Sequence, residues 1–274
     1  MSVTGRLEGR VAFVTGAALG LGRAISLAMA AEGADVVLFD RCEDLPGRRL
    51  ASAADLEQTA QEVERSGRRA LRAQGDVRSA VDLDRVVQRV GQEFGRLDIV
   101  VANAGFGAPD TPFWKLAEET WDQVLDVNLK GCWLTCRAAA PALIRAGGGV
   151  MILVSSNFGL KAARGATPYV AAKHGVVGLA KVLAMDVATY NIRVNAICPG
   201  SMDTEGNRAG AAADGLPFEQ WVRRYTSQQL FPVVQSASDV ARVSVWLATD
   251  DARFITGHAL PLDAGSTLAG YTPP

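Results

Sequence analysis

A glycine-rich turn near the start of the chain constrains the fold more than any other feature. The β-branched run Val11–Val14 leads into Thr15-Gly-Ala-Ala-Leu-Gly-Leu-Gly22, and a helical pattern follows at once. In such a turn Gly16 permits the tight bend, Gly20 permits close approach of the backbone to a ligand, and Gly22 permits close helix packing. A pyrophosphate would rest on the amides that open the helix, so the pattern predicts a dinucleotide site.

The rest of the chain alternates short β-branched runs with helical stretches, which is typical of a parallel sheet covered on both faces. The predicted strands are Val11–Val14, Val36–Phe39, Leu71–Gln74, Ile99–Val101, Val150–Val154, Arg193–Ile197 and Ala259–Leu262. The predicted helices include Leu21–Ala31, Ala53–Ser66, Val81–Phe94, Glu118–Ala146, Pro168–Tyr190 and Ser238–Ala248. We therefore expect one α/β domain of Rossmann type, spanning 1–274, with a doubly wound, seven-stranded parallel sheet. Two smaller domains are the alternative.

Two stretches interrupt this alternation. Residues 41–52 follow the second strand with Pro46, Gly47 and several charges, and form an insertion longer than a usual connection. Residues 201–234 follow the sixth strand and mix small residues with Trp221, Tyr225 and Phe231. We expect this second segment to form a lid over a substrate.

Composition points to a small molecule as the partner. The formal net charge of −1 and the absence of a basic stripe give no reason to expect nucleic acid or an anionic membrane. There is neither a leader-like apolar stretch nor an apolar run of membrane-spanning length, so we expect a cytoplasmic protein. Four scattered cysteines agree with a reducing compartment; Cys132 and Cys136 are expected to be core thiols rather than metal ligands, and no metal site is predicted.

Charged residues at strand ends bear on the choice of dinucleotide. Asp40 ends the second strand, where a carboxylate accepts hydrogen bonds from both ribose hydroxyls and repels a 2′-phosphate, which favours NAD over NADP. Arg41 is the opposing signal, because a guanidinium there could pair with a 2′-phosphate. Asp76, with Val77 beside it, ends the third strand and would hold the adenine amino group; a helix N-cap is the alternative for Asp76.

Tyr169 and Lys173 lie one helical turn apart in Tyr-Val-Ala-Ala-Lys, so the lysine can favour the tyrosine phenolate and make it an acid/base near neutral pH. Ser156 ends the fifth strand, and Ser155 competes with it, since alternation along a strand sends only one of the two hydroxyls to the site. Asn128 is either a polar group aimed at the lysine or a simple irregularity in a helix.

These motifs resemble those of the short-chain dehydrogenase/reductases, and the resemblance runs from Leu7 to Gly265. Its elements occur in order: Thr15 to Gly22, Asn103-Ala-Gly105, Asn128, Ser156, Tyr169 with Lys173, Asn195, and Pro199-Gly200. The resemblance implies a catalytic tetrad of Asn128, Ser156, Tyr169 and Lys173. It also implies that 103–105 line the cofactor, that 199–204 hold its carboxamide, and that the long helices beginning near Glu118 and Pro168 build a homotetramer. The whole cofactor site predicted in this way comprises Gly16, Gly20, Leu21, Gly22, Asp40, Asp76, Val77, Asn103, Ala104, Gly105, Tyr169, Lys173, Pro199, Gly200 and Thr204.

A narrower likeness concerns the insertion. Asp40-Arg-Cys-Glu-Asp, the run from Leu50 to Thr59, and Ser66-Gly-Arg-Arg resemble the mycofactocin-associated, carveol-dehydrogenase-like branch, whose members are thought to keep NAD bound without exchange. The run Pro199-Gly-Ser-Met-Asp-Thr-Glu-Gly206 departs from that branch's usual Asn-Val-x-Thr-Pro-Met pattern.

The function expected from these residues is NAD-dependent interconversion of a secondary alcohol and a ketone. Lys173 and the positive nicotinamide would lower the pKa of Tyr169, and Ser156 would hydrogen-bond the reacting oxygen. Apolar residues near the site favour a hydrophobic, cyclic or terpene-like substrate: Phe106, Phe158, Met202, Trp221, Tyr225 and Phe231. Lys161 and Arg164 either pair with an anionic substrate or lie in a solvated loop. The alternatives are a sugar, a hydroxy acid or an acyl thioester as substrate, a dehydratase or epimerase on the same fold, and a non-catalytic redox sensor.

Overall fold

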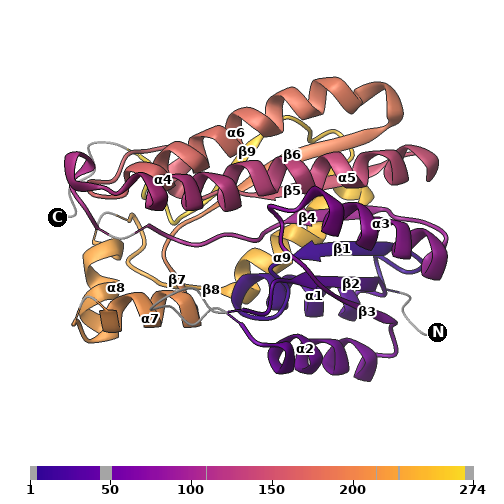
Figure 1. Cartoon of the computed structure of the whole chain (residues 1–274), viewed down its shortest axis with the longest axis horizontal. Coiled ribbons are helices and arrows are strands. Elements are labelled where there is room, and N and C mark those ends of the chain that lie inside the picture. The colour runs from indigo at the N-terminus through magenta and orange to yellow at the C-terminus, as the bar shows by residue number, and fades with distance from the viewer. Residues whose placement is uncertain (1–4, 44–50, 109, 214, 228, 269–274) are drawn as a thin grey trace.

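Seven parallel strands form one sheet in the order β3-β2-β1-β4-β5-β6-β9 (Figure 1), in a computed structural model that describes residues 5–43, 51–108, 110–213, 215–227 and 229–268. The strands are β1 (Val11–Thr15), β2 (Asp35–Asp40), β3 (Ala70–Gln74), β4 (Ile99–Ala102), β5 (Gly149–Val154), β6 (Ile192–Pro199) and β9 (Ala259–Leu262). The chain runs outward from β1 to β3 and then returns to β4 beside β1, which makes a switch point between β1 and β4. The predicted seven-stranded, doubly wound α/β fold is confirmed.

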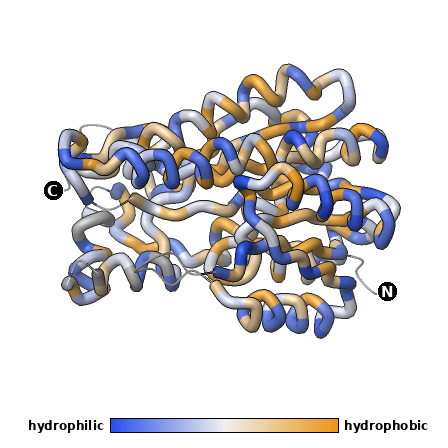
Figure 2. Tube along the Cα trace, in the orientation of Figure 1, coloured by the Kyte–Doolittle hydropathy of each residue, from blue (hydrophilic) through white to orange (hydrophobic). Residues whose placement is uncertain are grey.

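Helices cover both faces of this sheet (Figure 1). One layer contains α3 (Ala80–Phe94), α4 (Glu118–Leu125), α5 (Gly131–Arg145) and α6 (Thr167–Val187), and the other contains α1 (Gly20–Ala31), α2 (Ala53–Arg65) and α9 (Ala237–Ala248). Each layer has its own apolar core against the sheet, because alternate strand residues face opposite sides; Phe13 belongs to the first core and Val14 to the second. Figure 2 shows apolar residues concentrated along the strands, while the outer side of α2 is hydrophilic.

Capping boxes set the starts of two helices. Ser52 accepts a hydrogen bond from the Asp55 amide, and the Asp55 carboxylate accepts one from the Ser52 amide, which closes a capping box at the start of α2. Ser236 and Asp239 make the same reciprocal pair at α9. Each cap contributes on the order of 1 kcal/mol to helix stability.

The predicted helix from Glu118 to Ala146 is interrupted. A π-helical segment, Asp126–Lys130, lies between α4 and α5, and Asn128 is its only residue classed as buried. The sequence pattern does not distinguish this segment from ordinary helix, because one wider turn leaves the apolar spacing on either side nearly unchanged.

The predicted lid contains secondary structure that the sequence did not indicate. Strands β7 (Met202–Asp203) and β8 (Gln235–Ser236) pair at its base, and helices α7 (Glu205–Ala213) and α8 (Phe218–Thr226) lie between them. The Arg208 guanidinium lies 4.4 Å from the Phe218 ring centroid and pairs with Asp203 at 2.7 Å, so the two helices pack on each other. In Figure 1 they stand at the end of the sheet where the strands terminate.

Most of the predicted insertion at 41–52 lies outside the described residues, and so does the side chain of Tyr225. Within the described part of the chain, no helix is both long and apolar enough to span a bilayer.

Candidate active site

The glycine turn has the backbone geometry that the sequence predicts. Gly16 has φ of 67° and Gly20 has φ of 56°, both in the left-handed region that favours glycine. A Cβ on Gly22 would lie 1.9 Å from the Gly16 carbonyl oxygen, so no other residue fits where α1 meets the turn. A Cβ added to Gly20 would have one neighbour within 4 Å among the atoms that the structure describes, the Glu205 carboxylate of the lid at 3.7 Å. The turn therefore offers an open backbone cradle of the kind that a pyrophosphate needs.

Thr15 joins this turn to the neighbouring strand, a role that we did not predict for it. Its hydroxyl oxygen accepts hydrogen bonds from the amides of Asn103 and Ala104, each at 3.1 Å. The Asn103 amide group in turn donates to the carbonyls of Thr15 at 2.9 Å and Gly16 at 3.2 Å. The position of Thr15 at the start of the glycine motif was the available signal. These bonds hold the predicted 103–105 segment against the switch point.

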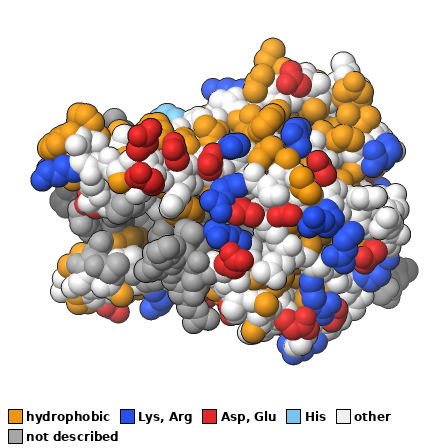
Figure 3. Space-filling model, viewed as in Figure 1, with side chains coloured by type: hydrophobic (Ala, Val, Ile, Leu, Met, Phe, Trp, Pro, Cys, Tyr) orange, Lys and Arg blue, Asp and Glu red, His pale blue; other side chains and the backbone are white. Residues whose placement is uncertain are grey.

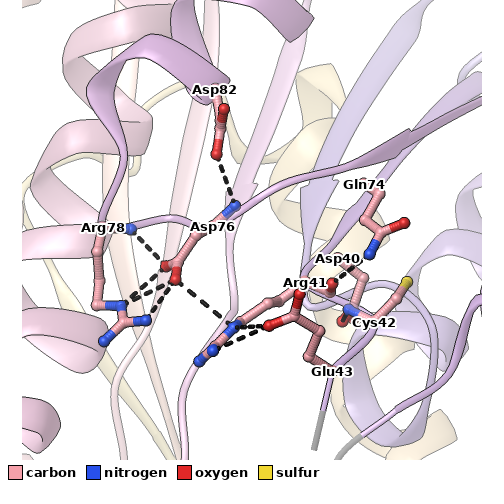
Figure 4. A network of polar contacts seen from close by, with 8 residues as sticks. All are labelled: Asp40, Arg41, Cys42, Glu43, Gln74, Asp76, Arg78 and Asp82. Atoms are coloured by element: carbon pink, nitrogen blue, oxygen red, sulfur yellow. Dashed lines mark hydrogen bonds and ion pairs between the residues drawn. The ribbon is translucent and has the colours of Figure 1, made fainter.

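Asp40 lies at the end of β2 and faces the glycine turn. Its two carboxylate oxygens accept from the amides of Ala18 and Cys42, both at 3.1 Å. Arg41 points away from Asp40 toward other carboxylates (Figure 4): its guanidinium lies 3.0 Å from Glu43 and 3.7 Å from Asp76. The Arg41 guanidinium, which could have attracted a 2′-phosphate, is thus paired with carboxylates of this chain.

The Asp76 carboxylate is bound by Arg78. Arg78 donates its backbone amide at 2.9 Å and its guanidinium at 2.6 Å (Figure 4), and although burial opposes ionisation, the bonds from Arg78 keep the pKa of Asp76 below its ordinary value. The alternative role as a helix cap is wrong, because Ser79 caps α3 and accepts from the Asp82 amide. The adenine contact of Asp76 stays a prediction.

The two serines after β5 point in different directions. Ser155 donates its hydroxyl to the Lys173 carbonyl at 2.9 Å and therefore joins β5 to the backbone of α6. The Ser156 hydroxyl accepts from the Phe158 amide at 3.2 Å and donates to Asn157 Oδ1 at 3.1 Å. Since Ser155 is bound to α6, Ser156 is the serine available to the site.

Lys173 is buried beneath Tyr169. Its Nζ donates to the Val154 carbonyl at 2.8 Å and lies 5.5 Å from the centroid of the Tyr169 ring. Burial lowers the pKa of Lys173 from 10.5 to about 8, because removal from water disfavours the charged form. The pair lies one turn apart on α6, as the sequence predicts, and the Phe158 ring packs edge-on against Tyr169 at 6.5 Å.

Asn128 reaches the same region from the π-helical segment. Its amide nitrogen donates to the carbonyls of Phe106 and Val124, both at 3.0 Å, and its Oδ1 is buried without a partner among the described residues. A Cβ on Gly105 would lie 2.5 Å from that Oδ1 and 3.5 Å from Lys173 Nζ. Both polar groups therefore lie next to Gly105, where a larger residue would collide with Asn128. Both interpretations describe Asn128 in part: it lies in a helix irregularity, the π-helical segment, and its Oδ1 is directed toward the neighbourhood of the lysine.

The remaining predicted cofactor residues lie around this centre. The side chains of Leu21 and Val77 are buried in the two cores, which leaves their backbones to contact a ligand. At the end of β6, the Gly200 amide, next to Pro199, donates to the Leu262 carbonyl at 2.8 Å, and the Thr204 hydroxyl accepts from the Asn207 amide at 3.2 Å. Asn195 is fully buried and bridges to the segment before β9, accepting from the His258 amide at 3.1 Å.

Lys161 makes a contact that the sequence did not indicate. Its Nζ donates to the Ser266 carbonyl at 2.6 Å, and burial lowers its pKa, so it joins its loop to the segment after β9; pairing with an anionic substrate stays a prediction. Arg164 is exposed. Cys132 and Cys136 are core thiols as expected, with a hydrogen bond between them that raises the pKa of Cys136. No group of three metal-binding side chains occurs in the residues that the structure describes.

Comparison with known proteins adds family and cofactor information. A family model described as Enoyl-(Acyl carrier protein) reductase matches residues 16–267. The (-)-trans-carveol dehydrogenase of Rhodococcus erythropolis is 40% identical over 275 aligned residues, which cover 96% of this chain and 99% of that protein.

Solved structures of NAD-bound dehydrogenases share the fold of this chain. Carveol dehydrogenase from Mycobacterium avium in complex with NAD superposes with a TM-score of 0.92 at 36% identity, covering 97% of this chain and 100% of that one. A short chain dehydrogenase from Mycobacterium paratuberculosis bound to NAD superposes with a TM-score of 0.88 at 38% identity, covering 96% of this chain and 99% of that one.

Proposed function

Because the chain belongs to the short-chain dehydrogenase/reductase family, we propose that it interconverts a hydrophobic, cyclic secondary alcohol and the corresponding ketone. It is an NAD-dependent oxidoreductase. The observation that carries the substrate proposal is the 40% identity to (-)-trans-carveol dehydrogenase over nearly the whole chain. The Phe158 ring beside Tyr169 supports it, since an apolar wall next to the reacting oxygen suits an apolar substrate.

The residues of this chain fit NAD. Gly16, Gly20 and Gly22 leave the backbone open for a pyrophosphate, and Asp40 stands at the strand end beside them for the ribose. When bound, NAD accepts a hydride from the alcohol or donates one to the ketone.

The proton chemistry belongs to the protein. We assign Tyr169 as the acid/base that takes the alcohol proton, with Lys173 favouring its phenolate form. Ser156 donates a hydrogen bond to the same substrate oxygen and orients it. Asn128 holds a water that connects Lys173 with solvent; its buried Oδ1, directed toward Gly105 and Lys173, supports this role.

The first test is to denature extensively dialysed protein and identify any dinucleotide released. Added NAD, or an artificial electron acceptor if NAD is retained, should then support oxidation of carveol. Turnover of 3-oxoacyl thioesters without turnover of cyclic alcohols would contradict the substrate proposal. Bound NAD with no turnover of any alcohol or ketone would favour the redox-sensor alternative, and a cofactor that ends each full cycle in its original redox state would favour a dehydratase or epimerase.

Glu43 is expected to support the preference for NAD. Replacing it by Gln removes one of the two carboxylates that face Arg41, which frees positive charge for a 2′-phosphate while Asp40 remains. Because partly exposed ion pairs contribute up to about 1 kcal/mol, we expect the NADP-to-NAD ratio of kcat/KM to rise by about 3- to 5-fold. Steady-state kinetics with both cofactors gives this ratio. Glu93→Gln, which breaks the pair with Arg89 on α3, is the control, and an equal change in both variants would contradict a role for Glu43.

We also propose that the chain forms a homotetramer through α4, α5 and α6. Apolar side chains gather over α5 and α6 (Figure 3). Exposed apolar side chains of these two helices include Trp133 on α5 and Val182 and Met185 on α6. A hollow of about 360 Å³ between these helices is lined by Leu125, Asp126, Leu129, Lys130, Trp133 and Leu179. Apolar patches of this kind mark protein interfaces. Sedimentation velocity should give the mass of four chains, and a monomer at micromolar concentration would contradict the proposal.

The four cysteines are all free, which supports the proposal of a reducing, cytoplasmic location. Fractionation of the producing cells tests it, and recovery outside the cytoplasm would oppose it.

A further inference from the structure

A buried chain of hydrogen bonds leads from Ser156 to the segment that follows β9. Ser156 Oγ lies 3.1 Å from Asn157 Oδ1, Asn157 Nδ2 lies 2.9 Å from Ser266 Oγ, and Ser266 Oγ lies 3.0 Å from Asp263 Oδ2. All four residues are at most 8% exposed. Asn157 and Ser266 are separated by 109 positions in the sequence, so the fold alone brings them together.

We propose that Asn157, Ser266 and Asp263 form a relay that orients the hydroxyl of Ser156, with Asn157 and Ser266 as positioning residues for the reaction. The effect of the relay on catalysis rests on the proposed function, whereas its hydrogen bonds are present in the protein without substrate.

The direction of each bond follows from the chemistry of its partners. Asp263 accepts at Oδ2 from the Thr267 amide at 2.8 Å and from the Ser266 hydroxyl, and at Oδ1 from the Gly265 amide at 3.0 Å. Since a carboxylate only accepts, Ser266 must donate to it, and the Ser266 oxygen then accepts from Asn157. The amide of Asn157 is thereby fixed with its nitrogen toward Ser266 and its oxygen toward Ser156.

This arrangement fixes both ends of the Ser156 hydroxyl. The oxygen accepts from the Phe158 amide, and the proton points at Asn157 Oδ1 until a substrate oxygen takes its place. The Phe158 amide and Asn157 hold Oγ in one place in the resting protein, so on substrate binding only the proton turns from Asn157 Oδ1 to the substrate oxygen, and the oxygen itself is already positioned.

The turn that carries Ser266 is itself anchored from two other directions. Lys161 Nζ donates to the Ser266 carbonyl at 2.6 Å, and Gln229 of the lid segment donates to the Asp263 carbonyl at 3.1 Å. Ser266 is therefore held by contacts that do not involve Ser156, as a positioning residue must be.

The test compares Ser266→Ala with Ser266→Thr, which keeps the hydroxyl, each in the wild-type and Ser156→Ala backgrounds. Ser266→Ala should lower kcat by about 10-fold, less than the roughly 10²-fold that misplacing a reacting group can cost, with the KM for NAD unchanged. Ser266→Thr should recover most of the loss. In the Ser156→Ala background, Ser266→Ala should change kcat by less than about twofold, because residues that act through one group are not additive.

A matched control separates orientation from loss of stability. Ser244 is a fully buried serine on α9 whose hydroxyl donates to the Val240 carbonyl of the same helix, so Ser244→Ala removes a buried hydroxyl that is not bonded to the relay. It should lower the melting temperature without lowering kcat.

Hydrogen exchange at the Phe158 amide gives a readout that needs no substrate. Exchange should be faster in Ser266→Ala than in the wild type or Ser244→Ala, because that amide donates to Ser156 Oγ. An equal loss of kcat in both backgrounds, or unchanged exchange, would overturn the relay. If no alcohol is turned over by the wild type, the proposed function fails while the exchange measurement still decides on the relay.

Discussion

Tyr169→Phe is expected to lower kcat/KM for the alcohol by at least about 10²- to 10⁴-fold, the contribution typical of a general acid/base. The variant loses the phenolic oxygen but keeps the ring, so the edge-on packing with Phe158 and the position over Lys173 are retained. NAD affinity should change little. Steady-state kinetics and a cofactor titration measure the two effects.

Tyr190→Phe is the matched control for this variant. Tyr190 is 47% exposed and lies in the short 3-10 helix Ala188–Tyr190 that follows α6. It should retain wild-type kinetics. Normal turnover by Tyr169→Phe would exclude the proposed acid/base.

Lys173→Met should abolish most of the turnover and, at neutral pH, stabilise the cofactor-free protein. Burial lowers the pKa of Lys173 from 10.5 to about 8, so below pH 8 the folded state holds its ammonium at a cost of about 3 kcal/mol, an order-of-magnitude value. Part of this gain, about 1 kcal/mol, is offset because the Val154 carbonyl loses its bond from Nζ. A net increase of about 2 kcal/mol in unfolding free energy is expected at pH 7.

The pH dependence identifies the origin of this gain. Between pH 8 and 10.5 the unfolded wild type binds the Lys173 proton more strongly than the folded state does, so wild-type stability receives an increasing contribution as pH rises through this window. Lys173→Met lacks that contribution, and its advantage should shrink toward pH 10. Urea unfolding at pH 7 and pH 9.5 measures it. A variant less stable than the wild type at pH 7, with the same pH slope, would contradict burial of the ammonium as the cause.

Much of the fold could be predicted from sequence because its signals are local. Every predicted strand overlaps an observed one, and Ala259–Leu262 has the predicted bounds. The helices α7 and α8 were missed because each spans only nine residues, which is short for recognition of a helix from its pattern, and because α7 consists mainly of glycine and alanine.

The candidate site likewise has parts that the sequence predicts and parts that it does not. The spacing of Tyr169 and Lys173 predicts that they share a face of one helix, and the structure places them so. Two other features could not be predicted. Arg41 pairs with Glu43 and Asp76 because of the direction of its side chain, and Asn157 bonds Ser266 because the fold brings distant segments together. The local sequence pattern contains no information on side-chain direction or on such long-range contacts.

The π-helical segment Asp126–Lys130 has a consequence for how this region could change in evolution or by design. The wider turn there absorbs one residue more than an ordinary turn holds. Deleting a neighbour of Asn128 in the segment would therefore restore a regular helix with α4 and α5 close to their present relative orientation, while the side chains within the turn would change direction. The amide of Asn128 would then leave the vicinity of Gly105 even though no site residue had been replaced. A deletion of one residue would leave every sequence motif of the site intact and would still move the Asn128 amide away from Lys173.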